Sequence, residues 1–291
     1  MTLSVEVKDL TIRYGETVAV DGLTLKLAGG KIYGLLGRNG SGKTSVLSAV
    51  SAFRKATSGA VLVGGAEPFE NAALTRQICF VRDRVDAQDG DCARGVFRMA
   101  RMLRPNWDEE YAQALIERFH VPLKKRIGAL SRGAKSALSV TLGLAARAPV
   151  TIFDESYLGM DAPSRYAFYD ELLNDYIAHP RTIIISTHLI EEVGSLFEEV
   201  VIIDKGRLVA HDDTEALRAR GVAVTGPADA VAEFTAGRTV LGDQRLGGTR
   251  STTIYGQLTA EERGRARGAG LDLGPVGLQD LFVHLTAEER R

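Results

Sequence analysis

A glycine-rich segment at Gly37–Thr44 reads G-R-N-G-S-G-K-T. Its residue types and their spacing are those of a site that binds phosphates. Its glycines let the backbone turn tightly and point N–H groups inward, where a Cβ would obstruct phosphates. Lys43 could reach β- and γ-phosphates, and the Thr44 hydroxyl could ligate Mg²⁺. The residues predicted on this basis to contact a nucleotide are Gly37, Arg38, Asn39, Gly40, Ser41, Gly42, Lys43, Thr44 and Ser45.

The elements around this segment favour a phosphate-binding loop over a glycine-rich turn with a coincidental Lys-Thr pair. A short apolar run at 31–36 reads as a strand, and 43–51 reads as a helix. A strand, loop and helix in this order place the positive end of the helix dipole at the phosphates. Kinases, GTPases and motor ATPases share such a loop, so it does not by itself say which class of enzyme this is.

An acidic pair follows a second apolar strand, where Pro149–Glu155 reads P-V-T-I-F-D-E. A strand that ends in two acids puts carboxylates at the carboxyl end of a parallel sheet, where ligands bind. Asp154 is then placed to hold Mg²⁺, often through water, and Glu155 to polarise an attacking water. The alternative is a strand that ends in a solvated acidic turn.

The pattern along the chain predicts two parts. The first contains strands over 3–14, 22–27, 149–153, 182–186 and a final strand over 199–204, with mostly helical 93–145 and a helix over 162–178. After about Asp213 the composition shifts toward Gly, Ala and Arg. The expected elements there are strands at 222–225, 239–241, 252–255 and 271–273, with helices at 228–236, 259–267 and 278–285. Thr259 and Glu262 form a capping box, and the βαββαβ order indicates a small ferredoxin-like unit.

Composition and charge narrow the function classes. The chain has 291 residues, 45% of them hydrophobic, and a formal net charge of −1, so no nucleic-acid partner is expected. The two cysteines, Cys79 and Cys92, lack the spacing of a metal site. The N-terminus lacks the pattern of a secretion signal, and the longest apolar runs are far shorter than the ~20 residues of a membrane span.

Two further motifs lie on either side of the acidic pair in the sequence. Leu130–Lys135 reads L-S-R-G-A-K and lies nineteen residues before Pro149, while His188 follows the strand T-I-I-I-S-T. With these motifs, residues 3–212 resemble the nucleotide-binding subunit of an ATP-binding cassette (ABC) transporter. The resemblance implies an α/β P-loop NTPase, with a RecA-like parallel sheet core and an N-terminal antiparallel β part. It also implies an inserted α-helical subdomain at about 84–146 and an ABC ATPase domain over 1–212, followed by a small α+β domain over 213–291.

The resemblance also assigns roles. It makes Glu155 the catalytic glutamate and His188 the switch histidine, beside Lys43 in the catalytic set and Thr44 and Asp154 at the metal. It pairs Ser131 and Gly133 of the signature motif with the γ-phosphate held by a facing subunit. The remaining matches are Asp161 of the D-loop at the dimer seam and Tyr14, which would stack on adenine unless it packs in the core.

The implied function is ATP hydrolysis, with Mg²⁺, by a dimer that drives a separate transmembrane permease subunit at the cytoplasmic face of the plasma membrane. The second nucleotide-binding subunit is either identical or homologous, and residues near 83–104 are expected to form the permease-facing groove. The tail Gly277–Thr286, G-L-Q-D-L-F-V-H-L-T, is similar to that of bacterial ABC-2-type exporters and so favours export over import. The alternative is an amphipathic helix that only closes a small domain. The alternatives are a DNA- or ribosome-associated ABC ATPase, which usually has a coiled-coil insertion or two cassettes, and a metabolic P-loop kinase.

Three positions depart from the family pattern. Asp83 stands where the Q-loop glutamine is expected; it could still bind Mg²⁺, although Gln88 is a second candidate for that role. Arg132 replaces the first signature glycine and could contact nucleotide or permease, or lie in solvent. Ser156 replaces the proline that usually follows the catalytic glutamate, which is expected to change local stiffness and little else.

Overall fold

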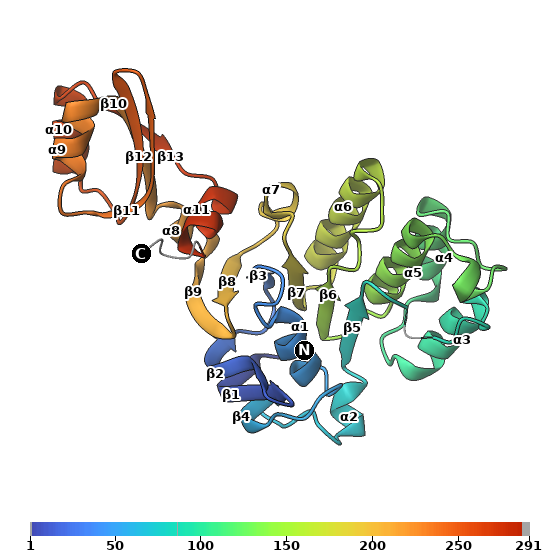
Figure 1. The fold of residues 1–291 in the computed structure, drawn as a ribbon. Helices are drawn as coiled ribbons and strands as arrows, with labels where there is room; N and C mark the ends of the chain where they lie inside the picture. The colour runs from blue at the N-terminus through green and yellow to red at the C-terminus, as the bar shows by residue number, and fades with distance from the viewer. Residues whose placement is uncertain (1, 86, 287–291) are drawn as a thin grey trace. The chain divides into compact units, whose positions relative to one another are not determined.

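The computed structural model describes residues 2–85 and 87–286. Asp86 of the expected helical subdomain and residues 287–291 of the expected C-terminal domain lie outside this range. The chain divides into two compact units, Met1–Leu208 and Val209–Arg291, and each is described by itself (Figure 1).

A sheet in the order β5-β6-β7-β3-β8-β9 has its first five strands and the start of β9 in the first unit. The pairs β5–β6, β6–β7, β7–β3 and β3–β8 are parallel. Every residue of β3, β6 and β7 is buried, which explains why these strands read as continuous apolar runs. The strands are β3 (Ile32–Leu36), β5 (Ile78–Arg82), β6 (Val150–Asp154), β7 (Thr182–Thr187), β8 (Glu199–Asp204) and β9 (Arg207–Asp213).

The strand β9 corrects one expectation, because β8 is not the final strand before the composition shift. Residues 207–209 of β9 are exposed and 210–212 are half-buried, so the segment lacks the alternation of a half-buried strand. Nothing in its hydrophobic pattern therefore marked it in the sequence.

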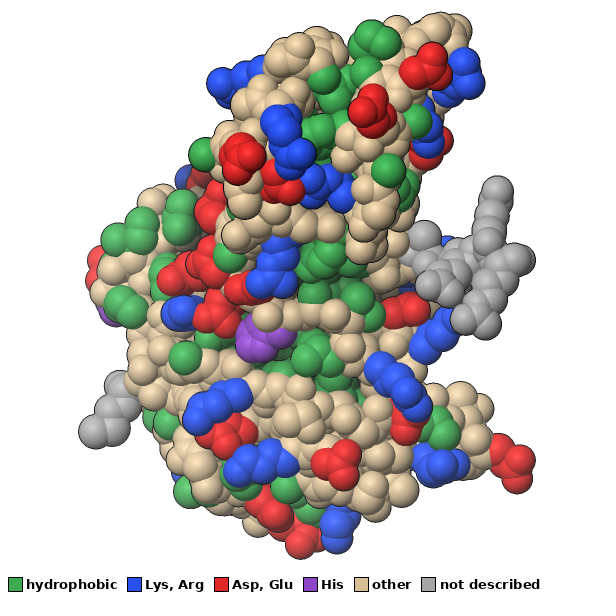
Figure 2. Space-filling model, turned by 90° about the vertical axis from the view of Figure 1, so that its left-hand side faces the viewer, with side chains coloured by type: hydrophobic (Ala, Val, Ile, Leu, Met, Phe, Trp, Pro, Cys, Tyr) green, Lys and Arg blue, Asp and Glu red, His purple; other side chains and the backbone are tan. Residues whose placement is uncertain are grey.

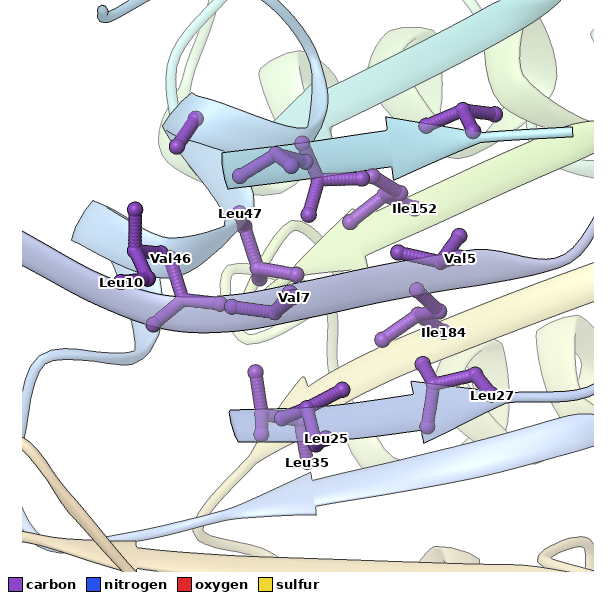
Figure 3. Packing of buried hydrophobic residues seen from close by; sticks show 14 of the residues in the cluster. Val5, Val7, Leu10, Leu25, Leu27, Leu35, Val46, Leu47, Ile152 and Ile184 are labelled. Carbon is purple, nitrogen blue, oxygen red and sulfur yellow. The ribbon is translucent and has the colours of Figure 1, made fainter. Parts of the chain in front are cut away.

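A second, antiparallel sheet packs over the helix that follows the glycine loop. Its order is β2-β1-β4, from β1 (Val5–Tyr14), β2 (Thr17–Leu27) and β4 (Ser58–Val63). Figure 3 shows Val46 and Leu47 of α1 (Lys43–Val50) among Val5, Val7, Ile152 and Ile184, which come from strands of both sheets. The buried face of α1 therefore fixes the glycine loop, at the start of that helix, against both sheets.

The helices α3, α4 and α5 gather beyond β5 (Figure 1). Here α5 packs against α3, α4, β5 and β6, and α3 to α5 form a group at one side of the unit (Figure 1). Asp108 caps α4, as the acidic residues near a helix start predicted. The elements are α2 (Ala72–Thr75), α3 (Ala93–Leu103), α4 (Glu109–Arg118), η1 (Ile127–Ala129), α5 (Arg132–Ala145), α6 (Ala162–Ala178) and α7 (Ile190–Val193).

The second unit is a four-stranded antiparallel sheet in the order β11-β12-β10-β13. Its own core contains Val222, Val224, Val231 and Ile254. The predicted capping box at Thr259 and Glu262 is confirmed at the start of α10. The elements are α8 (Thr214–Arg218), β10 (Gly221–Pro227), α9 (Ala228–Thr235), β11 (Thr239–Leu246), β12 (Thr249–Tyr255), α10 (Ala260–Gly268), β13 (Asp272–Pro275) and α11 (Leu278–Leu285).

Two surface observations bear on function. Among the described residues, no helix has both the length and the apolar character needed to cross a bilayer. Figure 2 shows that the Lys and Arg side chains of one face are interspersed with those of Asp and Glu. The described side chains on this face therefore create no extended field of one sign.

Candidate active site

The glycine loop lies between β3 and α1, and two of its glycines fill places where no side chain fits. A Cβ on Gly37 would lie 2.3 Å from Ser41 Oγ and 2.6 Å from the Ile203 carbonyl oxygen. Gly42 has φ +102°, and its Cβ would lie 2.4 Å from the Ala19 carbonyl oxygen. The neighbouring strands therefore hold the loop in a shape that requires glycine at both positions.

Backbone hydrogen bonds also hold the glycine loop in its shape. The Gly206 N–H donates to the Ser41 carbonyl at 3.0 Å, and the Ser41 N–H donates to the Arg38 carbonyl at 3.0 Å. No acidic side chain occupies the first turn of α1, so the helix presents its N–H groups without a competing anion. The loop is thus built to receive an anionic group.

The Lys43 side chain bends back over this loop. Its Nζ donates to the carbonyls of Gly37 at 2.7 Å and Arg38 at 3.3 Å, and it lies 4.0 Å from Glu155 Oε1. Burial lowers the pKa of the Lys43 ammonium, while the carboxylates of Glu155 and Asp154 act in the opposite direction. A phosphate would offer this buried ammonium a stronger anionic partner than the two neutral carbonyls.

Thr44 and Asp154 form the pair of oxygen donors predicted for a metal. The Thr44 hydroxyl donates to Asp154 Oδ2 at 2.8 Å, whereas Oδ1 is buried with no hydrogen bond of standard geometry to a described residue. Burial raises the pKa of the Asp154 carboxyl, and the hydroxyls of Ser186 and Thr44 oppose that rise. Mg²⁺ binds through one or two protein oxygens plus substrate phosphates and water, so this donor pair fits it without a full protein cage.

Glu155 and His188 meet at the carboxyl ends of β6 and β7. The Glu155 N–H donates to the Ser186 carbonyl at 3.1 Å, and Glu155 has φ +52°, a left-handed conformation that is uncommon outside glycine. Its Oε1 lies 3.2 Å from His188 Nδ1, and both side chains are partly exposed. A carboxylate held in a strained turn beside an imidazole and a buried ammonium is a suitable acid–base site.

Asp83 and Gln88 lie on the segment that follows β5. Arg82 pairs with Asp154 across β5 and β6, so the next residue, Asp83, stands at the same edge of the sheet as Glu155. Both Asp83 and Gln88 are exposed, and the Gln88 N–H donates to Asp91 Oδ2 at 3.0 Å. The structure therefore places Asp83 beside the acidic strand end without joining it to Asp154 by a direct contact.

The signature residues form a second group. Ser131 caps α5, with its hydroxyl accepting from the Ala134 N–H at 3.2 Å, and a Cβ on Gly133 would lie 3.1 Å from the Gly159 carbonyl oxygen. Gly159 also donates to Ser136 Oγ at 3.2 Å. Asp161 caps α6 by accepting from the Ser164 N–H at 3.0 Å. The signature and the residues before α6 therefore pack as one surface, with Ser131 and Asp161 exposed on it.

Tyr14 ends β1 beside the first turn of α1. The residue is 46% exposed, so it does not pack in the core, and its hydroxyl lies 3.4 Å from Ser45 Oγ. Of the other departures, Arg132 is exposed and Ser156 is fully buried. An exposed aromatic beside a phosphate loop is available to stack on a base.

Three positioning residues were not found by sequence reasoning. These are Gly159, which leaves room for the signature helix, Ser186, whose carbonyl fixes the Glu155 backbone, and Gly206, which braces the glycine loop. These contacts are made by backbone atoms or depend on the absence of a side chain, so no residue type marked them in the sequence. In the sequence, the strand T-I-I-I-S-T indicated the position of Ser186, and the turn at Lys205–Gly206 indicated that of Gly206.

Comparison with known proteins identifies this arrangement. The model of the ABC transporter family matches residues 20–157, which include the glycine loop, the signature segment and the acidic strand end. The chain carries an ATP-binding domain of the ABC transporter family. It is accordingly an ATP-binding, transport-coupled ABC-type ATPase.

Curated relatives extend the similarity along the chain. It is 26% identical over 302 residues to a Nod factor export ATP-binding protein I of Burkholderia orbicola, covering 98% of this chain and 97% of that protein. It is 26% identical over 300 residues to the daunorubicin resistance ATP-binding protein DrrA3 of Streptomyces coeruleorubidus, covering 96% and 94%. For the ABC transporter ATP-binding protein YtrB of Bacillus subtilis, the identity is 27% over 214 residues, covering 74% and 73%.

Solved structures show the same ABC cassette fold. The ATP-binding subunit of one ABC transporter superposes with a TM-score of 0.66 at 22% identity, covering 74% of this chain and 91% of that one. The cassette MJ0796, in a dimeric post-hydrolysis state with ADP and Pi, gives a TM-score of 0.64 at 18% identity, covering 72% and 98%. The expected P-loop NTPase fold is thereby confirmed.

Proposed function

We propose that this chain powers a bacterial exporter by hydrolysing ATP at the site formed by the glycine loop, Asp154, Glu155 and His188. The observation that carries the proposal is the run of contacts from Lys43 to Glu155 to His188 across the carboxyl ends of three parallel strands. Ligands bind at that edge of such a sheet. The run places a cation for phosphate, a base for water and a second polar group within reach of one substrate.

The residues have separate roles in this proposal. The N–H groups of the glycine loop and the Lys43 ammonium hold the β- and γ-phosphates, while Tyr14 stacks on adenine. Glu155 polarises the attacking water, and His188 orients Glu155 and contacts the γ-phosphate. Thr44 and Asp154 would hold Mg²⁺, with Asp83 as an additional oxygen donor; the ion supplies neutralisation of charge on the phosphates.

The signature surface completes the site from a second subunit. Ser131 and Gly133 are exposed or partly exposed at the start of α5, whose N-terminus suits an anion, and Asp161 lies on the same surface. We propose that these residues meet the γ-phosphate held by the P-loop of a facing subunit, identical or homologous. ATP then joins the two subunits and hydrolysis releases them, which is a two-state element biased by the γ-phosphate.

A groove between β5, α3 and α5 is proposed to receive the permease. It encloses about 250 Å³ and is lined largely by apolar side chains, including Phe80, Met99, Leu103 and Leu142. Met99 and Leu103 are half-exposed, so an amphipathic helix of a membrane partner could bury them. Docking there would hold the chain as a peripheral subunit at the cytoplasmic face of the plasma membrane.

Export as the direction of transport rests on the relatives. Two of them are named for export of Nod factor and for daunorubicin resistance, and they align with more than nine-tenths of this chain. That alignment includes the second unit, whose strand order β11-β12-β10-β13 we interpret as a ferredoxin-like accessory domain over 213–291. The substrate itself would be selected by the permease.

The test is affinity purification of the full chain from membranes of its own host. A co-purifying polytopic protein that is lost with Leu103→Asp, but kept with the matched surface change Ile177→Asp, supports the transport assignment and the groove. Leu103 lies on α3 and is 52% exposed, whereas Ile177 lies on α6 and is 68% exposed. Recovery with ribosomes or DNA alone would overturn the transport assignment.

A further inference from the structure

The exposed ring of Tyr14 has a partner that its adenine role does not explain. The Arg54 guanidinium stacks on the Tyr14 ring, with Cζ 3.8 Å from the ring centroid. The same guanidinium donates from Nη2 to the Arg13 carbonyl, next to Tyr14 in β1. Its Nε is buried and has no hydrogen-bond partner among the described residues, so the ring face is a principal contact of the cation.

The turn after α1 brings Arg54 to this position. Ala52 has φ +61°, which reverses the chain as α1 ends, and the Arg54 N–H donates to the Ser48 carbonyl at 3.1 Å. Three residues on, Thr57 accepts from the Arg13 N–H at 3.0 Å. The segment after α1 is therefore fastened to the end of β1, and the Arg54 side chain has little freedom to leave the ring.

The ring of Tyr14 is thus contacted at one point by α1 and at a second by the segment that follows this helix. Ser45, in the first turn of α1, lies beside the phenol oxygen, and Arg54, just past the last turn, covers a ring face. The start of the same helix carries Lys43 and Thr44 of the phosphate loop. The distance between the phosphate loop and the aromatic platform is consequently set by α1.

We propose that Arg54 is a positioning residue for the nucleobase, which fixes the Tyr14 ring so that its other face receives adenine. The inference rests on the proposed role of Tyr14 and adds to it a layered arrangement of guanidinium, phenol ring and base. An exposed tyrosine would otherwise sample several rotamers, and each binding event would have to select one. A planar guanidinium is suited to this because it stacks on a ring while it donates to a carbonyl.

Replacement of Arg54 should therefore weaken binding of the base and leave binding of the phosphates unchanged. Arg54→Ala should weaken ADP binding about 3- to 10-fold, in the range of one cation–π contact or one ordered side chain. Binding of tripolyphosphate, which has no base, should change less than 2-fold. Arg54→Lys keeps the charge but lacks the planar fork, so it should resemble Arg54→Ala.

Lys55→Ala is the matched control. This neighbouring cation lies 5.6 Å from the centroid of another ring, Phe69, and removing it deletes the same charge one residue away. ADP and tripolyphosphate binding by Lys55→Ala should both match the unmodified chain. A general electrostatic or folding effect would instead appear in both variants, or in both ligands.

The deciding experiment is a double-mutant cycle with Tyr14→Leu, measured by calorimetric titration of ADP and tripolyphosphate into the full chain. We expect Arg54→Ala to cost no further ADP affinity once Tyr14 is leucine. An equal loss of ADP affinity in both backgrounds, or equal losses for ADP and tripolyphosphate, would overturn the role of Arg54. If Tyr14→Leu itself leaves ADP binding unchanged, the adenine role of Tyr14 fails instead, and that outcome is distinct.

Discussion

His188 Nδ1 lies 3.2 Å from Oε1 of Glu155, at the ends of two adjacent parallel strands. The same carboxylate oxygen lies 4.0 Å from the buried Lys43 ammonium. Glu155 thus stands between an imidazole and a cation, and its left-handed backbone conformation holds it there.

Replacing His188 should slow the chemical step. Without the imidazole, Glu155 loses the group that orients it, so His188→Ala should lower kcat about 100-fold with little change in KM. Steady-state ATP hydrolysis over a range of ATP concentrations measures both constants. A large rise in KM at unchanged kcat would mean that His188 contributes only to binding.

Replacement of Gly37 by alanine should lower nucleotide affinity more than the same replacement of Gly40, although their stability costs overlap. Gly37→Ala introduces a Cβ into backbone and hydroxyl contacts below 3.0 Å, so the loop must shift, at about 1–3 kcal/mol of stability, and nucleotide affinity should fall with it. Gly40 has φ +81° but open space around it, so Gly40→Ala meets only backbone strain of ~1–2 kcal/mol. Thermal unfolding without ATP measures the stability cost, and the rise in unfolding temperature on adding ATP reports nucleotide affinity. An equal ATP-induced rise in both variants would contradict the steric argument.

The Q-loop position offers a comparison between neighbours. If Asp83 supplies an oxygen to the metal site, Asp83→Ala should raise the Mg²⁺ concentration needed for half-maximal ATPase activity several-fold. Gln88→Ala, five residues along the same exposed segment, should not. The reverse ranking would assign the role to Gln88.

Glu262 gives the second unit a defined acid sensitivity. Its ion pair with Arg238 at 2.6 Å, aided by the Thr259 N–H, lowers the pKa of the carboxyl from 4.5 to about 2. A depressed pKa in the folded state contributes stability above pH 4.5, and that contribution is lost as the pH falls toward 2. Glu262→Gln should therefore reduce stability at pH 6 and converge with the unmodified chain near pH 2 in urea unfolding. Curves that stay parallel would contradict the assignment.

Much of the site could be predicted because its residues carry their role in their type and spacing. The loop from Gly37, the acids at the end of β6 and the histidine after β7 all follow short apolar runs, which are typical of buried parallel strands. The boundary of α6 at Ala162–Ala178 and the capping box at Thr259 were also readable, because local capping chemistry specifies them.

The remaining features depend on contacts between distant segments. The stacking of Arg54 on Tyr14 joins residues forty positions apart, and neither residue type indicates which residue is its partner. Gly159 and Ser186 act through backbone atoms, which a sequence pattern does not reveal. The strand β9 was missed because it is largely exposed and lacks the hydrophobic period of a core strand.

We propose that Glu155 activates the water that attacks ATP. The most direct measurement is the rate of phosphate release from ATP by the unmodified chain and by Glu155→Gln, with Glu117→Gln, a change at an exposed position of α4, as the matched control. We expect a loss of at least about 100-fold for Glu155→Gln, with ATP binding retained and the control unaffected. Equal rates for Glu155→Gln and the unmodified chain would contradict it.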